Sequence, residues 1–547
     1  MIKNIYRYVI IACFAIFSLN TNAQISQGGQ PYSFSLKLEQ PNYLNSDPSE
    51  MYDIDSTASK DCNAVEFARF LPLNSQLGDD NWMITSLENG DHIYRMGIQS
   101  EGALAIGAYF KDFFLPKGSR LYIYSPDHQQ IKGGFSDLNN SKQGFFAAEY
   151  VLGDQLVIEY YEPSEVVGQG KFTLFEVLHA YKNVAEVDES KDYGDSGDCE
   201  INVNCPEGDG KKNQRDAVLR LLIKNGGSGV WCTGSLVNNT SEDRTPYVLT
   251  ADHCGKLASD EDMQLWLFYF HYQTWGCGNP DLEPDRKSLR GCEEIASSSN
   301  TGELGSDFFM VKLIQDIPET YNPYFLGWNR EGSVSQFGYG IHHPQGDVKK
   351  ISTYSDALQS ASYSDGINNG YWEVIWSETV TGHGVTEGGS SGSPIFDEEG
   401  YLIGTLTGGQ ASCNNQDAPD YYGKFSIHWK DNGTEVDEQL MPWLDPLQSG
   451  AMKMSGIYLG IDEQELLEQH LFQIRSNPVN EDLQLIFNER SQLFQIRLID
   501  IQGRIIYKQN HLSNELMSIP VSFLPKGIYV VQVQSGDELE SKKILKH

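Results

Sequence analysis

The chain has 547 residues, which is too long for one hydrophobic core and indicates about three or four domains. Its content of 52 Gly, 29 Tyr and 25 Phe favours strands and turns over helices. A formal net charge of -35 at pH 7 and an isoelectric point near 4.6 would repel a phosphate backbone, which excludes nucleic acid as a partner.

The first residues predict export. Lys3 and Arg7 precede an apolar stretch at 8–19, and small residues follow up to Ala23. This order is typical of a signal peptide over residues 1–23, and the stretch is too short for a transmembrane helix of roughly 20 apolar residues. Export permits disulfides. Of the 9 cysteines only Cys13 lies in the signal peptide, and none forms the paired CxxC knuckles of a structural zinc site.

Residues 24–193 predict a β-sandwich. Short apolar stretches at 103–106, 120–124 and 155–161 are separated by Gly, Pro, Asn and Asp. No nucleophile and base cluster there, so we expect a structural or inhibitory role. The acidic stretch 186–198 carries almost no apolar residues and predicts an exposed boundary that is open to proteolysis.

Residues 247–254 carry the first candidate for a catalytic group. An apolar strand ends at Thr250, and His253 follows directly before Cys254. A bridge from Cys254 to Cys232, on a neighbouring predicted strand, would pin the turn that holds the histidine. A general base needs such fixing, because its imidazole must lie within hydrogen-bond reach of the nucleophile.

Residues 386–396 predict that nucleophile. The pattern G-x-S-G-x-P places Ser391 at the tip of a glycine-rich turn that Pro394 closes before a strand. The backbone N–H groups of Gly389 and Ser391 would form an oxyanion hole. Asp307, at the start of the apolar stretch 308–313, is the predicted carboxylate that orients His253. The order His, Asp, Ser, with about 50 and 85 residues between members, matches the double-barrel serine proteases, which need no cofactor.

The part of the chain around these three residues resembles the bacterial secreted lysyl endopeptidases of the trypsin superfamily. The resemblance implies a chymotrypsin-like double β-barrel over residues 194–461, and the bridges Cys199–Cys413, Cys205–Cys277 and Cys232–Cys254. Cys62 and Cys292 stay unassigned: they bond across the two regions or stay free. The supporting strings are residues 196–199, 205–210, 232–239, 341–344 and 443–446.

The charge of the S1 site decides which side chain it accepts at P1. A trypsin-like S1 site needs a carboxylate at its base for Lys or Arg. The position that trypsins use, six residues before the nucleophile, is Val385 here. The resemblance implies Asp420 instead, with Asp417 as a nearby competitor. It also implies substrate contacts from Thr407, Gly408 and Gly409, and an aromatic ring against the catalytic histidine from Tyr363.

Other positions near the candidate site bear on its geometry and on how the enzyme is activated. We expect Asp252, next to the base, to face solvent; if it turned inward, it would raise the pKa of His253. Ser390 stands where trypsin has the aspartate that captures the freed N-terminus, so activation cannot use that ion pair. We expect residues 24–193 to block the site or to assist folding until cleavage near Lys191 releases them. His342 and His343 have no third ligand at a spacing that would suit a metal site.

Residues 462–547 begin with an acidic connector up to His470 and then alternate apolar and polar residues at 483–487, 496–500 and 528–533. Their strings resemble a type IX secretion sorting domain of Bacteroidota. The resemblance implies transport by the type IX secretion machinery, and then release or attachment at the cell surface. The strings are residues 476–479, 500–504, 524–529 and 542–547.

The sequence therefore predicts a mostly β protein in four parts. These are a signal peptide (1–23), a β-sandwich pro-domain (24–193), a trypsin-like serine protease domain (194–461), and a linker with a small β-sandwich sorting domain (462–547). We expect a monomeric zymogen that acts on proteins or peptides with a basic P1 residue, without metal or cofactor. The alternative is a catalytically inactive protease-fold adhesin or binding protein at the cell surface.

Overall fold

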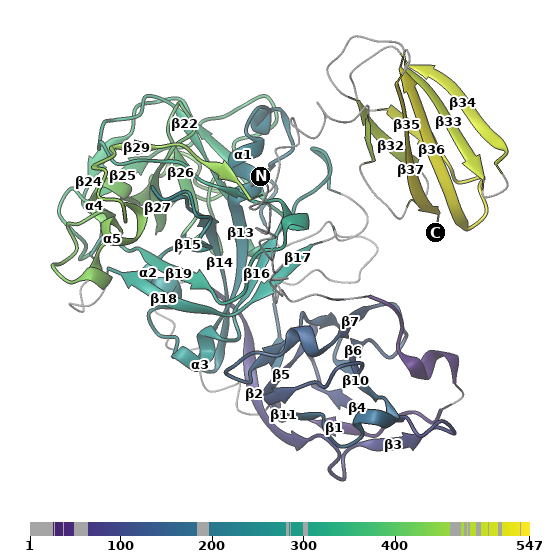
Figure 1. Cartoon of the computed structure of the whole chain (residues 1–547). Coiled ribbons are helices and arrows are strands. Elements are labelled where there is room, and N and C mark those ends of the chain that lie inside the picture. Colours follow the sequence, from purple (N-terminus) through teal and green to yellow (C-terminus); the bar gives the residue numbers. More distant parts are fainter. Residues whose placement is uncertain are drawn as a thin grey trace, which may run out of the picture. The chain divides into compact units, whose positions relative to one another are not determined.

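The computed structural model divides into two compact units, Met1–Leu459 and Gly460–His547, which are described separately (Figure 1). The signal peptide, most of the predicted boundary stretch 186–198, Cys62, Lys191 and the connector at 462–470 lie outside the described residues. No helix in the described part is long and apolar enough to cross a membrane. The structure describes residues 26, 28–36, 38–48, 64–182, 196–279, 284, 286–298, 305–459, 472–474, 479, 482–487, 494–500, 503–511, 517–535 and 538–546.

Strands dominate the described part, which confirms the mostly β fold class. The α-helices are short, between 4 and 6 residues each. Such helices are unstable alone and are held by the sheets around them. Their bounds are α1 (Lys212–Ala217), α2 (Asp252–Gly255), α3 (Asp260–Met263), α4 (Phe425–His428) and α5 (Met441–Leu444).

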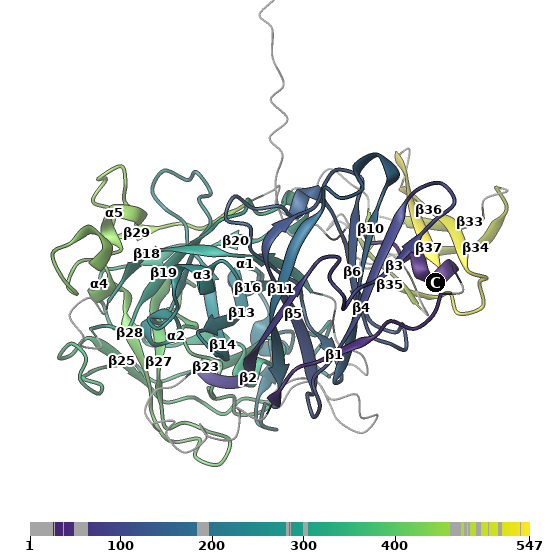
Figure 2. The same ribbon diagram turned by 90° about the horizontal axis from the view of Figure 1, so that it is seen from below.

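The N-terminal region is a β-sandwich, as its alternating apolar stretches predict (Figure 2). Its first sheet has the order β1-β4-β10-β6-β7, with β3 beside β4, and its second contains β2, β11, β5, β8 and β9. Met96, Ile158 and Phe172 are among the side chains of both sheets that meet in one core. The bounds are β1 (Tyr43–Asn45), β2 (Val65–Gln76), β3 (Met83–Ser86), β4 (His92–Gln99), β5 (Ala105–Phe114), β6 (Arg120–Tyr124), β7 (Ile131–Phe135), β8 (Phe146–Ala147), β9 (Val151–Leu152), β10 (Gln155–Glu162) and β11 (Lys171–Ala180).

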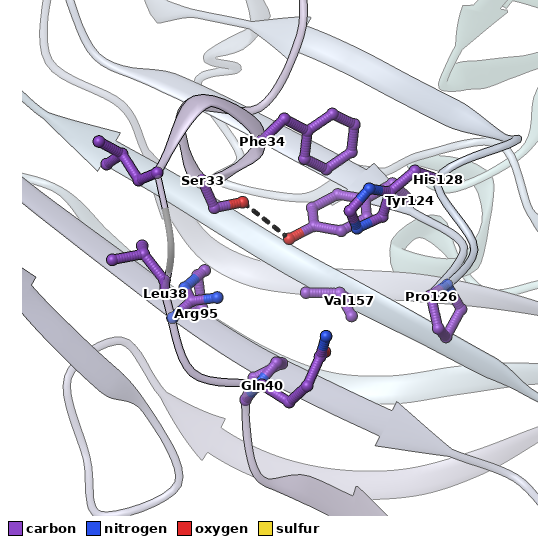
Figure 3. Close-up of a pocket in the computed structure, with 11 residues that line it drawn as sticks. Ser33, Phe34, Leu38, Gln40, Arg95, Tyr124, Pro126, His128 and Val157 are labelled. Atoms are coloured by element: carbon purple, nitrogen blue, oxygen red, sulfur yellow. Dashed lines mark hydrogen bonds between the residues drawn. The ribbon is translucent and has the colours of Figure 1, made fainter.

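A hollow of about 130 Å³ opens on the first sheet of this sandwich (Figure 3). It contains a serine and a histidine, but the two have different partners. Ser33 Oγ lies 3.3 Å from Tyr124 Oη, and the ring of His128 stacks on Phe34 with centroids 3.8 Å apart. The hollow therefore holds no serine–histidine pair in the described part.

Strand β2 joins the sandwich to the central region. Residues 68–76 of β2 pair with β11, and residues 65–69 run antiparallel to β14, with Val65 opposite Trp231 and Arg69 opposite Ser228. The rings of Phe67 and Trp231 stack 4.1 Å apart inside an apolar cluster that both regions share. The two regions thus form one continuous sheet, which has 12 strands among the described residues.

The first half of the central region wraps a sheet around an apolar core. β13 and β14 form a hairpin over Gly226 and Gly227, and the φ of +57° at Gly226 suits such a turn. β15, β19 and β18 continue from β14, while β16 and β17 continue from β13. Leu221, Trp266 and Val311 lie in the core. The bounds are β13 (Val218–Asn225), β14 (Ser228–Leu236), β15 (Tyr247–Thr250), β16 (Leu267–Phe270), β17 (Lys287–Arg290), β18 (Cys292–Ser297) and β19 (Phe309–Leu313).

The second half forms another curved sheet, in the order β12-β23-β22-β26-β27-β28-β25-β24. Trp372, Trp376 and Tyr422 fill its core, and a larger cluster around Phe308 and Trp328 packs the two halves together. The bounds are β12 (Ile201–Asn202), β20 (Tyr324–Phe325), β21 (Trp328–Asn329), β22 (Gly338–His342), β23 (Lys350–Tyr354), β24 (Gln359–Ala361), β25 (Tyr371–Val374), β26 (Pro394–Phe396), β27 (Leu402–Gly409), β28 (Asp420–Lys424), β29 (Lys453–Met454) and β30 (Ile457–Tyr458).

The second unit is a small sandwich of two sheets, β31-β32-β35 and β34-β33-β36-β37. Alternate residues of β33 and β36, such as Ile496 and Val531, point into one apolar core. The bounds are β31 (Phe472–Ile474), β32 (Asp482–Phe487), β33 (Phe494–Asp500), β34 (Ile505–His511), β35 (Met517–Pro520), β36 (Gly527–Ser535) and β37 (Glu538–Lys546).

Candidate active site

His253 lies on the one-turn helix α2, three residues after β15 ends at Thr250. A disulfide between Cys254 and Cys232 ties this turn to β14. One helical turn has no stability of its own, so the bridge and the sheet fix the position of the histidine. The bridge is the one that the sequence predicts to pin this turn.

Asp307 holds the imidazole of His253 through two hydrogen bonds. Nδ1–H of His253 donates to Oδ2 of Asp307 at 2.8 Å, and the backbone N–H of His253 donates to Oδ1 at 3.0 Å. Asp307 is fully buried and has a φ of +60°, a left-handed conformation that aspartate tolerates better than most residues. This arrangement leaves Nε2 of His253 as the proton acceptor of the ring.

A buried histidine supports the turn that carries Asp307. Nδ1 of His428 lies 2.6 Å from Oγ of Ser306, the residue before Asp307, and Nε2 lies 2.9 Å from Oγ1 of Thr405. Burial lowers the pKa of His428 to about 3, so the ring is neutral and bonds both hydroxyl groups without a charge. Sequence reasoning missed this histidine, because a lone His in an apolar segment forms no motif.

The loop of Ser391 has a shape that only glycine allows at two positions. Gly389 and Gly392 have φ angles of +89° and +79°. A Cβ at Gly392 would lie 2.1 Å from Oγ1 of Thr250, and one at Gly389 would lie 2.9 Å from the carbonyl oxygen of His343. The backbone N–H groups of Gly389 and Ser391 donate no hydrogen bond within the described part, so both can bind a developing oxyanion.

Ser391 lies beside the turn of His253. Its carbonyl oxygen accepts the N–H of Thr233 at 2.9 Å and lies 3.9 Å from Sγ of Cys254. Nε2 of His253 is buried and has no hydrogen-bond partner among the described residues, so Ser391 Oγ is not bonded to it. Such bonds often tighten only when substrate binds. The structure thus brings the three predicted residues together with the base–nucleophile bond still open.

Asp420 is a buried carboxylate at the start of β28, 1% exposed. Its Oδ2 accepts hydrogen bonds from Nε1 of Trp376 at 2.7 Å and from Oγ1 of Thr386 at 2.6 Å, and its Oδ1 accepts the N–H of Ala411 at 3.2 Å. Burial raises the pKa of Asp420 to about 6, although these hydrogen bonds oppose the shift. Asp417, the competitor, is exposed.

Sequence reasoning did not find the groups that hold Asp420. Thr386 follows Val385, which lies in the apolar core of the second half. The pattern G-x-S-G-x-P begins after Thr386, so it marks the nucleophile loop but not Thr386. Trp376 lies far from Asp420 in sequence, and nothing in its surroundings distinguishes it from an ordinary core tryptophan.

The other predicted substrate contacts lie on or beside the same strands. β27 and β28 run antiparallel, with Gly409 opposite Asp420 and Gly408 opposite Tyr421. Thr407 is fully buried, and its Oγ1 has no hydrogen-bond partner in the described part. The ring of Tyr363 stacks on that of Tyr421, with centroids 4.6 Å apart. The substrate roles of Tyr363, Thr407, Gly408 and Gly409 stay predictions.

The structure settles the predicted disulfides. Cys199–Cys413, Cys205–Cys277 and Cys232–Cys254 are all present, as predicted. Cys292 is a buried free thiol. The alternative for this thiol, a bond to Cys62, involves a residue outside the described part.

The prediction for Asp252 was wrong: this side chain is fully buried and does not face solvent. The backbone N–H of Asp252 donates to the carbonyl oxygen of Asp307 at 3.3 Å, which sets the helical turn close against the sheet. Nζ of Lys256, one turn later, reaches Oδ2 of Asp252 at 3.9 Å. The first residue of α2 therefore points inward.

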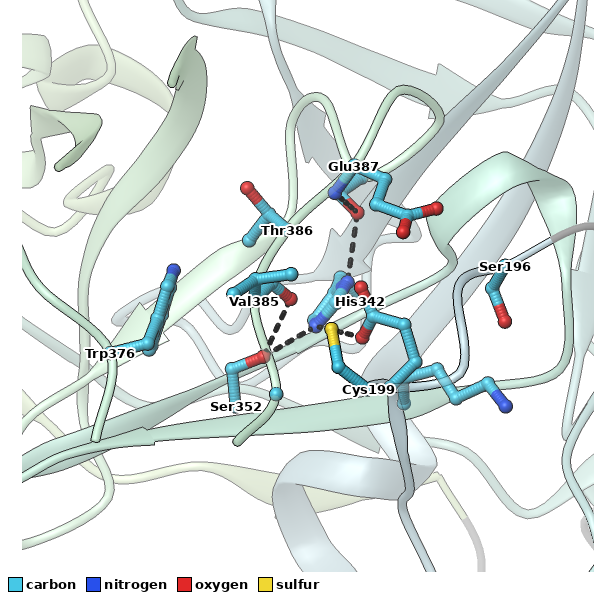
Figure 4. A network of polar contacts seen from close by, with 12 residues as sticks. Ser196, Cys199, His342, Ser352, Trp376, Val385, Thr386 and Glu387 are labelled. Carbon is cyan, nitrogen blue, oxygen red and sulfur yellow. Dashed lines mark hydrogen bonds and ion pairs between the residues drawn. The ribbon is translucent and has the colours of Figure 1, made fainter. Parts of the chain in front are cut away.

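His342 and His343 are buried structural residues. Nδ1 of His342 lies 2.8 Å from Oγ of Ser390, and Nε2 lies 3.0 Å from Oγ of Ser352 (Figure 4). Nδ1 of His343 lies 2.8 Å from the carbonyl oxygen of Asp347. No group of three or more His, Cys, Asp or Glu in the described part is placed to hold a metal ion.

Comparisons of sequence show which known proteins this chain resembles. Residues 193–423 match the family described as lysyl endopeptidase, C-terminal domain, and residues 476–547 match the secretion system C-terminal sorting domain. A lysyl endopeptidase of Pseudomonas aeruginosa is 25% identical over 367 residues, which cover 63% of this chain and 76% of the relative.

Solved structures that resemble this chain include a thermostable serine protease AL20 from an extremophilic microorganism and neuropsin from mouse brain. The first has a TM-score of 0.28 at 13% identity and covers 39% of this chain and 92% of its own. The second has a TM-score of 0.28 at 17% identity and covers 42% of this chain and 95% of its own. The similarity to lysyl endopeptidases rests on the sequence matches and not on these structural likenesses. The chain is a secreted or cell-surface serine protease that is similar to lysyl endopeptidases over residues 193–423 and carries a type IX secretion sorting domain at residues 476–547.

Proposed function

We propose that the central region hydrolyses peptide bonds on the carboxyl side of lysine, and the buried carboxylate of Asp420 carries this proposal. A buried carboxylate is costly unless a cation joins it. Trp376 and Thr386 both donate to Oδ2, and the N–H of Ala411 donates to Oδ1 at 3.2 Å. Oδ1, which accepts the longest of these three bonds, is the oxygen that we propose for a single further contact. The compact ammonium of lysine suits such a contact better than the planar guanidinium of arginine, which favours two parallel hydrogen bonds.

The proposed reaction is acyl transfer to water. Oγ of Ser391 attacks the peptide carbonyl while Nε2 of His253 takes its proton, and Asp307 keeps Nδ1 protonated and oriented. The N–H groups of Gly389 and Ser391 stabilise the tetrahedral oxyanion. His253 then gives the proton to the leaving amine, and water attacks the ester by the same steps, which frees Ser391.

We further propose that the N-terminal sandwich inhibits the uncleaved protein. Strand β2 begins at Val65, opposite Trp231 and thus next to the bridge that fixes the turn of His253. A Cβ at Gly388 would lie 2.0 Å from Cγ2 of Val65. Gly388 directly precedes the oxyanion-hole residue Gly389, so Val65 fills space at the nucleophile loop. A peptide cannot occupy this space at the same time.

The test of lysine specificity is cleavage of peptides that differ only in Lys, Arg or Leu at P1, with matured protein. We expect Lys-selective cleavage that Ser391→Ala lowers by about 10⁴-fold or more. Asp420→Asn should lower kcat/KM for the Lys peptide by about 10²- to 10³-fold, because the ammonium then lacks its buried counter-charge. Asp417→Asn, at the exposed neighbour, is the matched control.

The possible results distinguish the role of Asp420 from that of Ser391, and an active protease from an inactive adhesin. Cleavage without a basic preference would remove the role of Asp420 and keep that of Ser391. Protein that cleaves nothing and whose Ser391 is not labelled by a fluorophosphonate would point to the inactive adhesin instead.

A further inference from the structure

A buried arginine lines the hollow on the first sheet of the sandwich, and no described residue takes its hydrogen bonds (Figure 3). Arg95 lies on β4 and is 4% exposed. Its Nε has no hydrogen-bond partner in the described part of the chain. A guanidinium group carries five N–H donors, and leaving such donors unpaired in a buried position is costly. The side chain of Arg95 can therefore bind an acceptor in the hollow.

The carboxylate opposite Arg95 in the sheet is used by other groups. Glu159 on β10 pairs with Arg95 across the strands. Its Oε1 accepts the N–H of Ser33 at 3.2 Å, and its Oε2 accepts the O–H of Tyr124 at 3.4 Å. The negative charge of Glu159 thus offsets that of the guanidinium group inside the sandwich, but the N–H donors of Arg95 stay open to a ligand.

The hollow lies between the outer face of this sheet and the segment that precedes β1. Val157 and Tyr124, opposite each other on β10 and β6, belong to a small apolar cluster that is separate from the core between the two sheets. The segment covers this cluster and forms the other wall of the hollow with Ser33, Phe34, Leu36, Leu38, Gln40 and Pro41. A ligand would therefore meet apolar side chains on most sides and the N–H donors of Arg95 at one place.

These walls favour one class of anion. A carboxylate has two oxygens in one plane, which match two parallel N–H groups of an arginine, and an alkyl chain attached to it can pack on the apolar walls. A phosphate or sulfate would instead place further charged oxygens against those walls, which costs free energy. The hollow of about 130 Å³ equals about four waters at roughly 30 Å³ each, so the ligand must be small.

We propose that this hollow binds a short-chain carboxylate, with its two oxygens on Arg95 and its alkyl chain between Phe34, Leu38 and Val157. The site belongs to the sandwich and does not depend on the activity proposed for the central region. Among the described residues, Arg95 lies on the sheet, whereas Phe34 and Leu38 lie on the segment before β1. A bound carboxylate would thus fasten this segment to the sheet.

The test is isothermal titration of sodium butyrate into the uncut full-length protein that carries Ser391→Ala, so that the sandwich stays attached. We expect saturable binding with a Kd of about 1 mM or lower, which is attainable for a ligand of this size. Butyramide has the same shape without the charge, and inorganic phosphate has the charge without the alkyl chain. Each should bind at least about tenfold more weakly than butyrate.

Variants identify the residue that binds the carboxylate. Arg95→Lys keeps the charge but loses the planar pair of donors, so it should raise the Kd for butyrate by about tenfold. Arg120→Lys, at an arginine of the sandwich that does not line the hollow, is the matched control and should leave the Kd unchanged. Leu38→Glu keeps Arg95 and brings a carboxylate of the chain itself into the hollow, so it should also weaken butyrate binding by about tenfold.

The absence of saturable butyrate binding to the protein with an unaltered sandwich would overturn the proposal, whether or not the Arg95→Lys protein folds. Butyramide that binds as tightly as butyrate would show that Arg95 does not supply the contact. Phosphate that binds as tightly as butyrate would reject the carboxylate as the preferred ligand. A Kd that neither Arg95→Lys nor Leu38→Glu changes would place the butyrate outside this hollow.

Discussion

Among single residues, we expect Asp420 to set the pH range in which the proposed specificity site can bind a lysine side chain. Its pKa is raised to about 6, so the carboxylate that attracts the ammonium is present above that pH and is lost as the pH falls through it. An alkylammonium inhibitor such as n-butylamine stays protonated over this whole range. We expect its inhibition constant to be flat above pH 7 and to rise by about tenfold per pH unit well below 6.

The measurement is competition between n-butylamine and fluorophosphonate labelling of Ser391 from pH 4.5 to 8. The labelling rate without inhibitor reports the catalytic machinery and serves as the reference at each pH. An inhibition constant that does not change across pH 6 would show that no carboxylate of raised pKa binds the ammonium.

How much of the site follows from sequence depends on what each residue must do. His253, Asp307 and Ser391 stand in the chain order of the double-barrel serine proteases and in turns that suit their chemistry, so motifs mark them. Trp376, Thr386 and His428 only hold those residues or Asp420, and any buried donor in the right place would serve. The inward direction of Asp252 depends on how one helical turn packs, which no pattern of residue types encodes.

Among the elements, the start of β2 is the part of the structure that we expect to close the nucleophile loop. Gly388→Ala should displace it, because the new Cβ would lie 2.0 Å from Cγ2 of Val65. Overpacking of this kind costs about 1–3 kcal/mol. We therefore expect the uncut precursor of this variant to label with a fluorophosphonate about tenfold faster than the wild-type precursor.

The control is the double variant Val65→Ala/Gly388→Ala, which removes the methyl group that clashes. Cβ at position 65 would remain 3.5 Å from the new Cβ, an ordinary contact, so slow labelling should return. Uncut and cut protein are separated by gel before the label is counted. If the double variant labels as fast as Gly388→Ala, Val65 is not the obstructing group.

Strands with one buried face could be predicted from alternation, and β6 and β10 lie where the apolar stretches 120–124 and 155–161 place them. The pairing of β2 with β14 could not, because alternation reveals which face of a strand is buried and not which strand lies beside it. A boundary drawn in the chain between the sandwich and the central region therefore does not coincide with a break in the sheet.

At the scale of the whole first unit, Glu149 of the sandwich binds the central region through a charge pair. Its Oε2 accepts from Nε of Arg286 at 3.2 Å and its Oε1 accepts from Oγ of Ser288 at 2.6 Å. Burial alone would raise the pKa of Glu149, but Arg286, Lys132 and the Ser288 hydroxyl outweigh it and lower the pKa to about 2. The stabilisation is fully present above the ordinary glutamate pKa of about 4.3 and is lost as the pH falls through 2.

Glu149→Gln should therefore weaken retention of the cut sandwich on the protease at pH 7, by at most about 3 kcal/mol or roughly 100-fold in Kd, because Lys132 lies in the sandwich and its share of the pKa shift does not depend on the protease. The gap between variant and wild type should shrink as the pH falls from 4 to 3. Isothermal titration of the separated sandwich into the protease measures the Kd of each variant. Glu101→Gln, at an exposed glutamate of the sandwich, is the control. A gap that persists unchanged at pH 3 would mean that this carboxylate does not supply the difference.

The shared sheet also matters for solubility. When β2 departs, the backbone N–H and C=O groups of Ser228–Trp231 lose their partners and become a bare strand edge. Such edges invite pairing with other chains and begin aggregation. If the sandwich stays attached until export is complete, this strand edge remains paired during transport. If it were cleaved earlier, the protein would expose an unpaired strand edge in the periplasm. The sandwich would thus protect the cell from aggregates as well as from unwanted proteolysis.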